Sequence, residues 1–477
     1  TKDVFCTLPA TKAVIEDANS DVTLPADLNV TVDLDVDGNT TTDGITNAGN
    51  FSTDGGTIKL DGNYPTGTEN TALGDTALDS VQAGGNYNVV LGSRAGTNIT
   101  TGDNNVGVGA YALCDIQTNS QNVAIGTETL KKNTASNNTA VGYISLRCNT
   151  SGCQNTAVGS EALKTNTTAN NNTAVGHCSL TLNTTGTRNT GTGKSSLQAN
   201  TTGSCNSGHG MYALYNNTEG GNNVAVGTCS LFTNTTADNN TAVGLCSLYA
   251  NTTGSENTAV GTYALDANTT GAKNTAVGKN AGSAITTGTF NDIFGRSAGF
   301  DLTTGDYNVA VGSGSLANLT TTNDNTAVGH NALNTVVTGT QNTAVGTCAL
   351  HNTTVNCGTA VGYQSLKGNT TGDKNTAVGR NSANNNTTGS DNTVVGFCSL
   401  GTNTTGACNT AFGNYSLYSN TTANDNSAFG YNTLGLNTTG TNNVAMGRNA
   451  LLNNTTAANN TAVGKDSLCA NTTSENA

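Results

Sequence analysis

Every stretch of this 477-residue sequence that resembles an enzyme motif lacks a residue that its chemistry needs. Residues 193–195 read Gly-Lys-Ser, like the end of a phosphate-binding loop, but Arg188 stands where that loop has its first glycine. Gly107 and Gly109 resemble part of a dinucleotide-binding fingerprint, yet no helical pattern follows them. The histidines lack a companion serine, cysteine or carboxylate in a catalytic spacing; they are His177, His209, His330 and His351. The sequence therefore predicts no enzyme.

One acidic stretch has the spacing of metal ligands. Asp33, Asp35, Asp37 and Gly38 spell D-x-D-x-D-G, the opening of a calcium loop. The twelfth position of such a loop needs a glutamate, and here it is Gly44. Alternating aspartates along the solvent face of a strand give the same letters. Calcium is thus the one candidate cofactor, and the sequence otherwise predicts none.

Thirteen cysteines are the remaining residues with reactive side chains, and many keep a 17-residue spacing. The candidate disulfide pairs are Cys229–Cys246, Cys148–Cys153, Cys348–Cys357 and Cys398–Cys408. The first pair is one period apart and the second flanks a single turn, so both are within reach of a disulfide. The last two pairs fall at opposite ends of a repeat, which favours crosslinks between chains; unpaired small residues at tolerant corners are the alternative. Either way, this usage indicates an oxidising, extracellular setting.

These residues all sit in a repeat. Residues 257–278, NTAVGTYALDANTTGAKNTAVG, begin and end on the same pentapeptide, with Asn257 and Asn274 17 residues apart. Between Asn70 and Asn460 there are 24 copies, with slips only before Asn88 (18 residues), Asn138 (16) and Gly358 (16). Counted in places from its first asparagine, one repeat reads N-T-A-V-G-x-x-[AS]-L-x-x-N-T-T-G-x-x. A fixed period of this kind is typical of a solenoid.

The repeat predicts extended structure. Its pentapeptide is small and β-branched and closes on glycine, which favours a short strand and a turn. The segment x-[AS]-L-x at places 7–10 predicts a second, weaker strand, and N-T-T-G at places 12–15 predicts a turn. No repeat offers apolar residues at helical spacing. We therefore expect an all-β fold, a parallel β-solenoid or β-roll of about 24 coils of 17 residues over residues 70–477.

Stacking of these coils predicts a rod. Coils lie about 4.8 Å apart in a parallel solenoid, so 24 of them extend roughly 115 Å. The asparagines of places 1 and 12 should form vertical columns whose amides bond along the axis. In the pentapeptide, Ala259 and Val260 point to opposite faces of the strand and both are apolar. One face closes the roll, and the other favours burial against copies of the same chain, most economically in a homotrimer. A fatter single-chain solenoid is the alternative.

The repeat resembles a known family. The pattern NTAVGxxALxxNTTGxxNTAVG is similar to the head repeats of YadA-type trimeric autotransporter adhesins, whose N-S-V-A-I-G-x-x-S-x-A coils form left-handed parallel β-rolls in a trimer. It also resembles the NTAVG arrays of tail-fibre and structural proteins of marine phages and algal viruses. The resemblance covers the chain from Asn70 to its C-terminus. It implies a stacked trimeric rod that serves as a spacer or an adhesive surface.

Residues 1–69 differ from the array. They hold 10 Asp and 2 Glu against 3 Lys, a net charge of −9 in a chain of −13. Residues 21–62 alternate like short strands with Gly and Asn turns, which predicts a small β-rich segment that caps the solenoid or attaches it to a base. The overall acidity argues against nucleic-acid binding. No apolar run approaches the 18 residues of a membrane span, so we expect no membrane insertion.

Two features of the array point to carbohydrate. Tyr215, Phe232 and Tyr249 occupy place 10 of three consecutive repeats, where stacked rings make either a sugar-binding platform or a purely structural ladder. The turn at place 12 is an N-T-T sequon in most repeats. In a secretory pathway these turns are expected to be exposed glycan acceptors, and in a bacterial or phage setting they are only turns. The candidates are Asn183, Asn200, Asn234, Asn251, Asn268, Asn369, Asn403 and Asn437.

These patterns together predict a non-enzymatic structural fibre or adhesin rod. We expect it to be extracellular, on a virion or cell surface, where it gives reach and attaches to a host or a cell-surface glycan. The alternative is a subunit that polymerises end to end into an extracellular filament. Stacked threonine columns also fit an ice-binding face, although such arrays are general in solenoids.

Overall fold

The computed structural model describes residues 67–335 and 338–472, and within them the only regular element is a strand of three residues repeated 24 times. Each strand coincides with places 2–4 of a repeat. The strands are β1 (Thr71–Leu73), β2 (Val89–Leu91), β3 (Val106–Val108), β4 (Val123–Ile125), β5 (Thr139–Val141), β6 (Thr156–Val158), β7 (Thr173–Val175), β8 (Thr190–Thr192), β9 (Ser207–His209), β10 (Val224–Val226), β11 (Thr241–Val243), β12 (Thr258–Val260), β13 (Thr275–Val277), β14 (Asp292–Phe294), β15 (Val309–Val311), β16 (Thr326–Val328), β17 (Thr343–Val345), β18 (Thr359–Val361), β19 (Thr376–Val378), β20 (Thr393–Val395), β21 (Thr410–Phe412), β22 (Ser427–Phe429), β23 (Val444–Met446) and β24 (Thr461–Val463).

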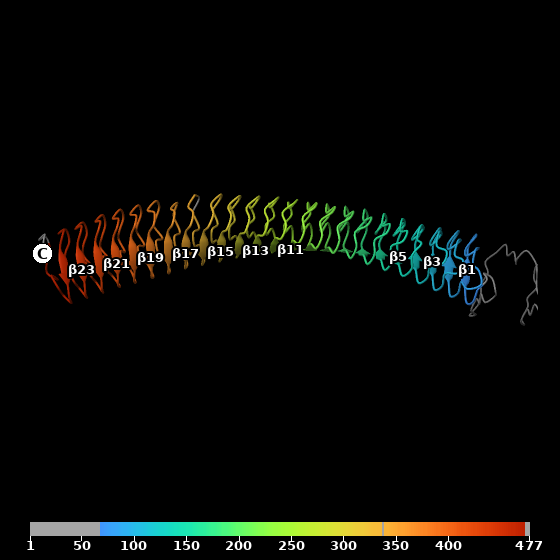
Figure 1. Ribbon diagram of the computed structural model, residues 1–477, viewed down its shortest axis with the longest axis horizontal. Coiled ribbons are helices and arrows are strands. Elements are labelled where there is room, and N and C mark those ends of the chain that lie inside the picture. Colours follow the sequence, from blue (N-terminus) through green and yellow to red (C-terminus); the bar gives the residue numbers. More distant parts are fainter. Residues whose placement is uncertain (1–66, 336–337, 473–477) are drawn as a thin grey trace, which may run out of the picture. The chain divides into compact units, whose positions relative to one another are not determined.

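Each strand pairs in parallel with the strand of the coil before it and with that of the coil after it, as Figure 1 shows. Register is strict: Thr258 lies beside Thr275 and Val260 beside Val277. The irregular coils keep this register, because Thr71 pairs with Val89 across the 18-residue step. Their extra or missing residue is therefore absorbed in a turn. The predicted parallel β-solenoid is confirmed.

The predicted second strand at places 7–10 is wrong. Those residues form turns, and two of them are left-handed: Tyr263 has a φ of 56° and Leu265 a φ of 51°. A backbone that returns to positive φ at every second residue cannot run straight. It still bonds between coils, because the Tyr263 N–H donates to the Leu245 carbonyl at 3.0 Å and the Leu265 N–H to the Ala281 carbonyl at 3.0 Å. Each coil therefore donates to the coil before it and to the coil after it.

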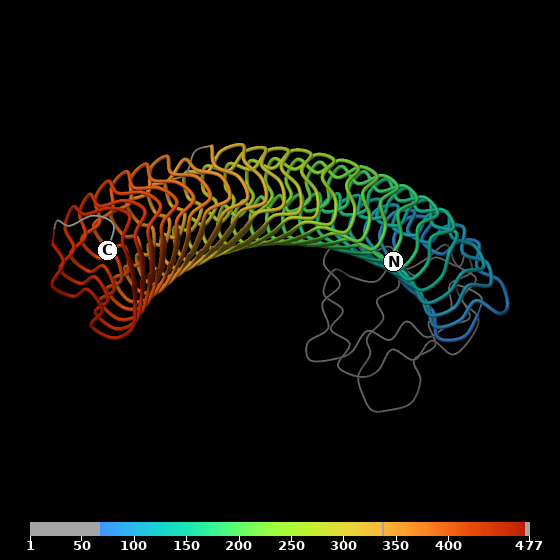
Figure 2. The same ribbon diagram turned by 60° about the vertical axis from the view of Figure 1, so that its left-hand side comes forward.

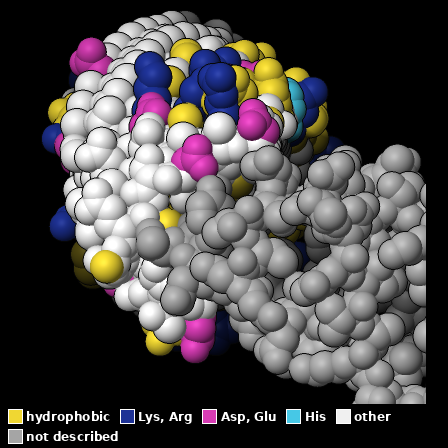
Figure 3. Space-filling model, turned by 90° about the vertical axis from the view of Figure 1, so that its right-hand side faces the viewer, with side chains coloured by type: hydrophobic (Ala, Val, Ile, Leu, Met, Phe, Trp, Pro, Cys, Tyr) yellow, Lys and Arg dark blue, Asp and Glu magenta, His cyan; other side chains and the backbone are white. Residues whose placement is uncertain are grey.

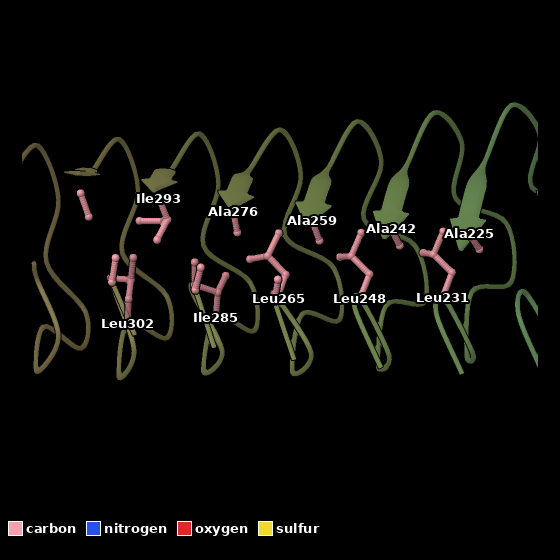
Figure 4. Packing of buried hydrophobic residues seen from close by; sticks show 14 of the residues in the cluster. Ala225, Leu231, Ala242, Leu248, Ala259, Leu265, Ala276, Ile285, Ile293 and Leu302 are labelled. Atoms are coloured by element: carbon pink, nitrogen blue, oxygen red, sulfur yellow. The ribbon is translucent and has the colours of Figure 1, made fainter. Parts of the chain in front are cut away.

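The apolar core lies between the strands and these turns. Ala259 on β12 points inward, and the Leu265 side chain meets it from the opposite wall of the coil, as Figure 4 shows. Both side chains are fully buried, whereas Val260 points outward and is 36% exposed. The left-handed conformation of a leucine costs roughly 1–2 kcal/mol. It persists here because the residue gains a buried side chain together with its inter-coil hydrogen bond.

The glycine of place 5 sets how closely coils approach. Gly261 has a φ of 140°, which side-chain-bearing residues rarely adopt, and a Cβ there would lie 2.4 Å from the carbonyl oxygen of Gly278. The same contact recurs from coil to coil. Glycine therefore stands at the corner after nearly every strand because the next coil occupies the space of a side chain. Figure 2 shows the resulting row of closely spaced coils, with the strands along its inner, concave side.

We predict that Gly261→Ala destabilises the chain by at least about 3 kcal/mol, through backbone strain added to the clash with Gly278. Gly107→Ala is the matched control. Gly107 lies at place 3, where most repeats have alanine, and its Cβ would meet Leu113 at an ordinary 3.4 Å. That variant should gain about 0.4–1 kcal/mol. Urea unfolding followed by circular dichroism measures both, and equal midpoints for the two variants would contradict the assignment.

Candidate functional site

Buried asparagines share the interior of the coils with the apolar core. The backbone N–H of Asn257 donates to Oδ1 of Asn240 on the preceding coil at 2.9 Å, and its Nδ2 donates to the Gly271 carbonyl of its own coil at 2.9 Å. The side chain is fully buried. The same pattern recurs in coil after coil, for example at Asn274. The predicted column of amides at place 1 is confirmed.

The asparagine of place 12 forms a second column. Nδ2 of Asn268 donates to Oδ1 of Asn251 at 2.8 Å and to the Gly271 carbonyl at 3.0 Å. Gly271 therefore accepts from both columns, because Asn257 bonds the same carbonyl. This shared acceptor closes the coil, since it joins the start of the repeat to the turn near its end. Most of the buried amide groups in these two columns are bonded along the axis or across the coil, as buried polar groups require.

The place-12 column is built in blocks. Asparagine runs without interruption from Asn133 to Asn268, and aliphatic side chains then replace it in the next three coils, at Ile285, Leu302 and Leu319. These three are fully buried and join the apolar core. At the boundary, Oδ1 of Asn268 has no hydrogen-bond partner among the described residues. Each Nδ2 of the column bonds the Oδ1 of the coil before it, so the change to an aliphatic residue after Asn268 leaves the last Oδ1 unpaired.

These columns correct the expectation that the sequons are exposed. All eight candidate asparagines have fully buried side chains. Their Nδ2 groups, which a glycan would have to occupy, donate inside the coil, as in the 2.8 Å bond from Asn200 to Asn183. In the folded chain these asparagines are therefore not accessible for glycosylation. The sequence suggested exposure because N-T-T-G reads as a surface turn, but the two threonines and not the asparagine face solvent there, as at Thr252 and Thr253.

We predict that Asn200→Ala destabilises the chain by about 2–4 kcal/mol, because it leaves Oδ1 of Asn183 unpaired and removes one acceptor from Asn217. Asn268→Ala should cost about 1 kcal/mol less, since no asparagine follows it in the column. Denaturation midpoints of the two variants in the same full chain make the comparison. Equal costs would show that the amides contribute as isolated bonds and not as a column.

The aromatic column at place 10 is a close stack. The rings of Tyr215 and Phe232 lie 5.1 Å apart at 3°, and those of Phe232 and Tyr249 lie 5.2 Å apart at 8°. Tyr212 meets Tyr215 edge-on at 5.4 Å. The predicted ring ladder is confirmed. The sugar-platform interpretation stays a prediction. A sugar would have to stack on ring faces, and these rings use their faces to stack on one another.

The twelve described cysteines carry free thiols, so the proposed disulfides stay predictions. Cys229 and Cys246 occupy the same place on consecutive coils, and each thiol influences the pKa of the other. Burial raises the pKa of both thiols, and the charge of Cys229 adds to the rise at Cys246. Cys357 and Cys408 are exposed. The other candidates are half-buried; they are Cys148, Cys153, Cys348 and Cys398.

We predict that mild oxidation of the folded chain joins Cys229 to Cys246, because stacked coils hold the two residues within the span of a disulfide. Alkylation of both thiols by iodoacetamide should be slow at neutral pH and rise with pH, because a raised pKa keeps the thiolate scarce. Peptide mass mapping detects the bridge, and Cys229→Ser is the control. Oxidised chains in which Cys246 still reacts fully with iodoacetamide would refute the pairing.

Charge is segregated between the two edges of the strand sheet. Places 6–11, which follow the strand, hold twelve Lys or Arg and eight Asp or Glu in residues 70–472. Places 14–17, which precede the next strand, hold three and nine respectively. Figure 3 shows basic and hydrophobic side chains gathered together along one edge. Between these edges, the outward positions of the strands carry a single carboxylate, Asp292.

The described residues contain no group of three or more His, Cys, Asp or Glu that suits a metal ion. The calcium candidate at Asp33, Asp35 and Asp37 lies outside the described residues, as does most of the predicted segment 1–69. In the described part of the chain, no helix has the length and apolarity to cross a membrane. No protein-family model matches the sequence, and no curated protein is significantly similar to it.

Proposed function

We propose that this chain is a non-enzymatic structural rod, displayed outside the cell on a virion or cell surface, where it gives reach and carries attachment surfaces. The observation that carries the proposal is the continuous hydrogen bonding between coils. Each coil donates to both neighbours through main-chain groups, and the buried amides add a second set of bonds along the same axis. Such a stack resists bending at any one coil, which suits a spacer.

Copies of the rod associate side by side through the outward face of the strands. That face is long, nearly free of charge and partly apolar, with Val226 39% and Val260 36% exposed. Place 4 is apolar in every coil except those of Thr192 and His209. At roughly 50 Å² of exposed apolar side chain in each of these coils, the face offers more than the ~800 Å² that each partner of a stable complex contributes. An exposed apolar face of this extent marks an interaction surface.

The charged edges favour a parallel arrangement. In a parallel assembly about an axis along the rod, the basic edge of one copy meets the acidic edge of the next. An antiparallel pair would instead bring like edges together. A parallel homotrimer buries the strand face and brings edges of opposite charge together. The resemblance to trimeric adhesin heads also supports three chains.

End-to-end polymerisation is the second candidate. In the last described coil, Leu468 is 38% exposed, whereas Leu451 at the same place of the preceding coil is fully buried. A further coil of the same kind would cover it, from this chain or from another. Electron microscopy separates the candidates, since rods of fixed length of roughly 115 Å indicate the first and long threads indicate the second.

We predict that Val226→Glu combined with Val260→Glu dissociates the assembly, because carboxylates buried between copies would have no partners. The matched control is Thr236→Glu combined with Thr253→Glu, which adds the same charge at exposed turn positions. Native mass measurement should give a multiple of the chain mass for wild type and control, and a monomer for the strand-face variant. A monomeric wild type would overturn the assembly, and globular beads in micrographs would overturn the rod.

A further inference from the structure

One row of outward side chains near the C-terminal end of the array differs from every other row. Place 6 of seven consecutive coils carries aromatic, basic and amide side chains and no carboxylate: Tyr363, Arg380, Phe397, Asn414, Tyr431, Arg448 and Lys465. Tyr415 and Tyr418 lie beside it at places 7 and 10 of one coil. We call these nine residues the aromatic–arginine ridge. At about 4.8 Å per coil it follows the rod axis for roughly 30 Å.

The arginines of the ridge are held by aromatic rings. The Arg380 guanidinium lies over the rings of Tyr363 and Phe397, 5.6 and 5.8 Å from their centroids. Arg448 lies 5.8 Å from the centroid of Tyr431. A guanidinium that packs on a ring face keeps its N–H donors free at its edge. Both arginines are therefore oriented in advance to donate to an anion.

The tyrosines of the ridge are also fixed. The Tyr415 ring meets Phe397, Tyr418 and Tyr431 edge to face, at centroid distances of 5.4, 5.7 and 6.2 Å. Three side chains nevertheless remain open to solvent: Tyr363 is 45% exposed, Tyr418 40% and Tyr431 46%. Side chains that are ordered before binding lose little entropy when a ligand arrives.

The arginines of the ridge are not paired with carboxylates. A few cations elsewhere in the described array are, as Lys131 and Arg147 with Glu128 at 3.0 and 2.7 Å. Among the described residues, neither Arg380 nor Arg448 forms such a pair. Asp466, one coil beyond Arg448, bonds Asn449 at 2.9 Å and Lys465 at 3.6 Å instead. Residues 358–472 hold five Lys or Arg and four Asp or Glu, so this section is net positive in an acidic chain.

We propose that the aromatic–arginine ridge binds a linear acidic polysaccharide, bearing sulfate or carboxylate groups, that lies along the rod axis. Arg380 and Arg448 are four coils apart, about 19 Å, and hold anionic groups of the polymer. The tyrosine hydroxyls and the Asn414 amide bond sugar hydroxyls between them. Single-stranded nucleic acid fits less well, because its bases need open ring faces and an arginine covers one face of each of Tyr363, Phe397 and Tyr431. This inference specifies the attachment role proposed above and does not require the assembly.

The test measures binding of the full chain to four immobilised polymers: a sulfated galactan, a polyuronate, neutral dextran and a single-stranded oligonucleotide. Arg380→Gln combined with Arg448→Gln should weaken binding to an acidic polysaccharide at least tenfold. The matched control is Lys279→Gln combined with Arg296→Gln, which removes the same charge at place 6 of two coils without an aromatic neighbour in that row. It should change the affinity less than twofold. Tyr431→Phe, which removes one hydroxyl from an exposed ring, should weaken binding without altering charge.

Preference for the galactan or the polyuronate identifies sulfate or carboxylate as the anionic group, and either supports the proposal. If the two glutamine variants lost the same affinity, the binding would reflect only general electrostatic attraction, and the proposal would be overturned. Ridge-dependent binding of the oligonucleotide alone, or binding of neither acidic polymer by wild type, would also overturn it. Circular dichroism and particle length are measured on the same samples. They show whether the rod is intact, so that a loss of binding by the ridge is distinguished from an error in the proposed rod structure.

Discussion

The hydrogen bond from one coil to the next is the constraint on which the rest of the structure depends. It fixes the coil spacing near 4.8 Å, and that spacing determines what each place of the repeat can hold. Gly261 is glycine because the carbonyl of Gly278 fills the position of a side chain. Asn257 is asparagine because the backbone N–H of Asn274 and the carbonyl of Gly271 both need partners, and the Asn257 amide accepts from the first and donates to the second. The repeat is strict because each coil offers the next coil the same hydrogen-bonding groups and the same space.

Because of the same spacing, each side chain contacts chiefly the residues at the same place in the coils before and after it. Amides bond amides, and the place-12 column holds aliphatic residues in blocks, at Val81, Ile99 and Ile116 and again from Ile285. Rings stack on rings at Phe232, and a cation between two rings packs on both, as Arg380 does. The unit of structure outside the core is therefore a column along the axis. A surface on this protein has to be described by rows, because residues adjacent in sequence point in different directions.

Periodicity predicted the columns well and the local backbone less well. The columns, such as that of Asn257, followed from the spacing, because a strict repeat at a fixed rise leaves few alternatives; which of Ala259 and Val260 faces the interior did not follow from it. The prediction of a second strand was wrong because the leucine residue type does not indicate a positive φ. Leu265 adopts this conformation because it buries the side chain and allows the hydrogen bond to Ala281. The sequon asparagines were misplaced for a related reason, since turn propensity reports backbone shape and not the direction of a side chain. The aromatic–arginine ridge had a visible signal, the row of place-6 residues, but its contacts needed coordinates.

Function on such a rod has to come from the places that the stacking leaves free. Places 1, 3, 8, 9 and 12 are committed to the interior and place 5 to the contact between coils, so a change at any of them acts on stability first. Places 6, 7, 10, 16 and 17 face outward, and their composition differs along the array while the backbone beneath them stays the same. A row of outward side chains can therefore gain rings, as at Tyr363 and Tyr431, or lose carboxylates without disturbing the coil. Because the backbone fixes their spacing, the affinity of such a row depends on which residues occupy it and not on how the chain folds around a ligand.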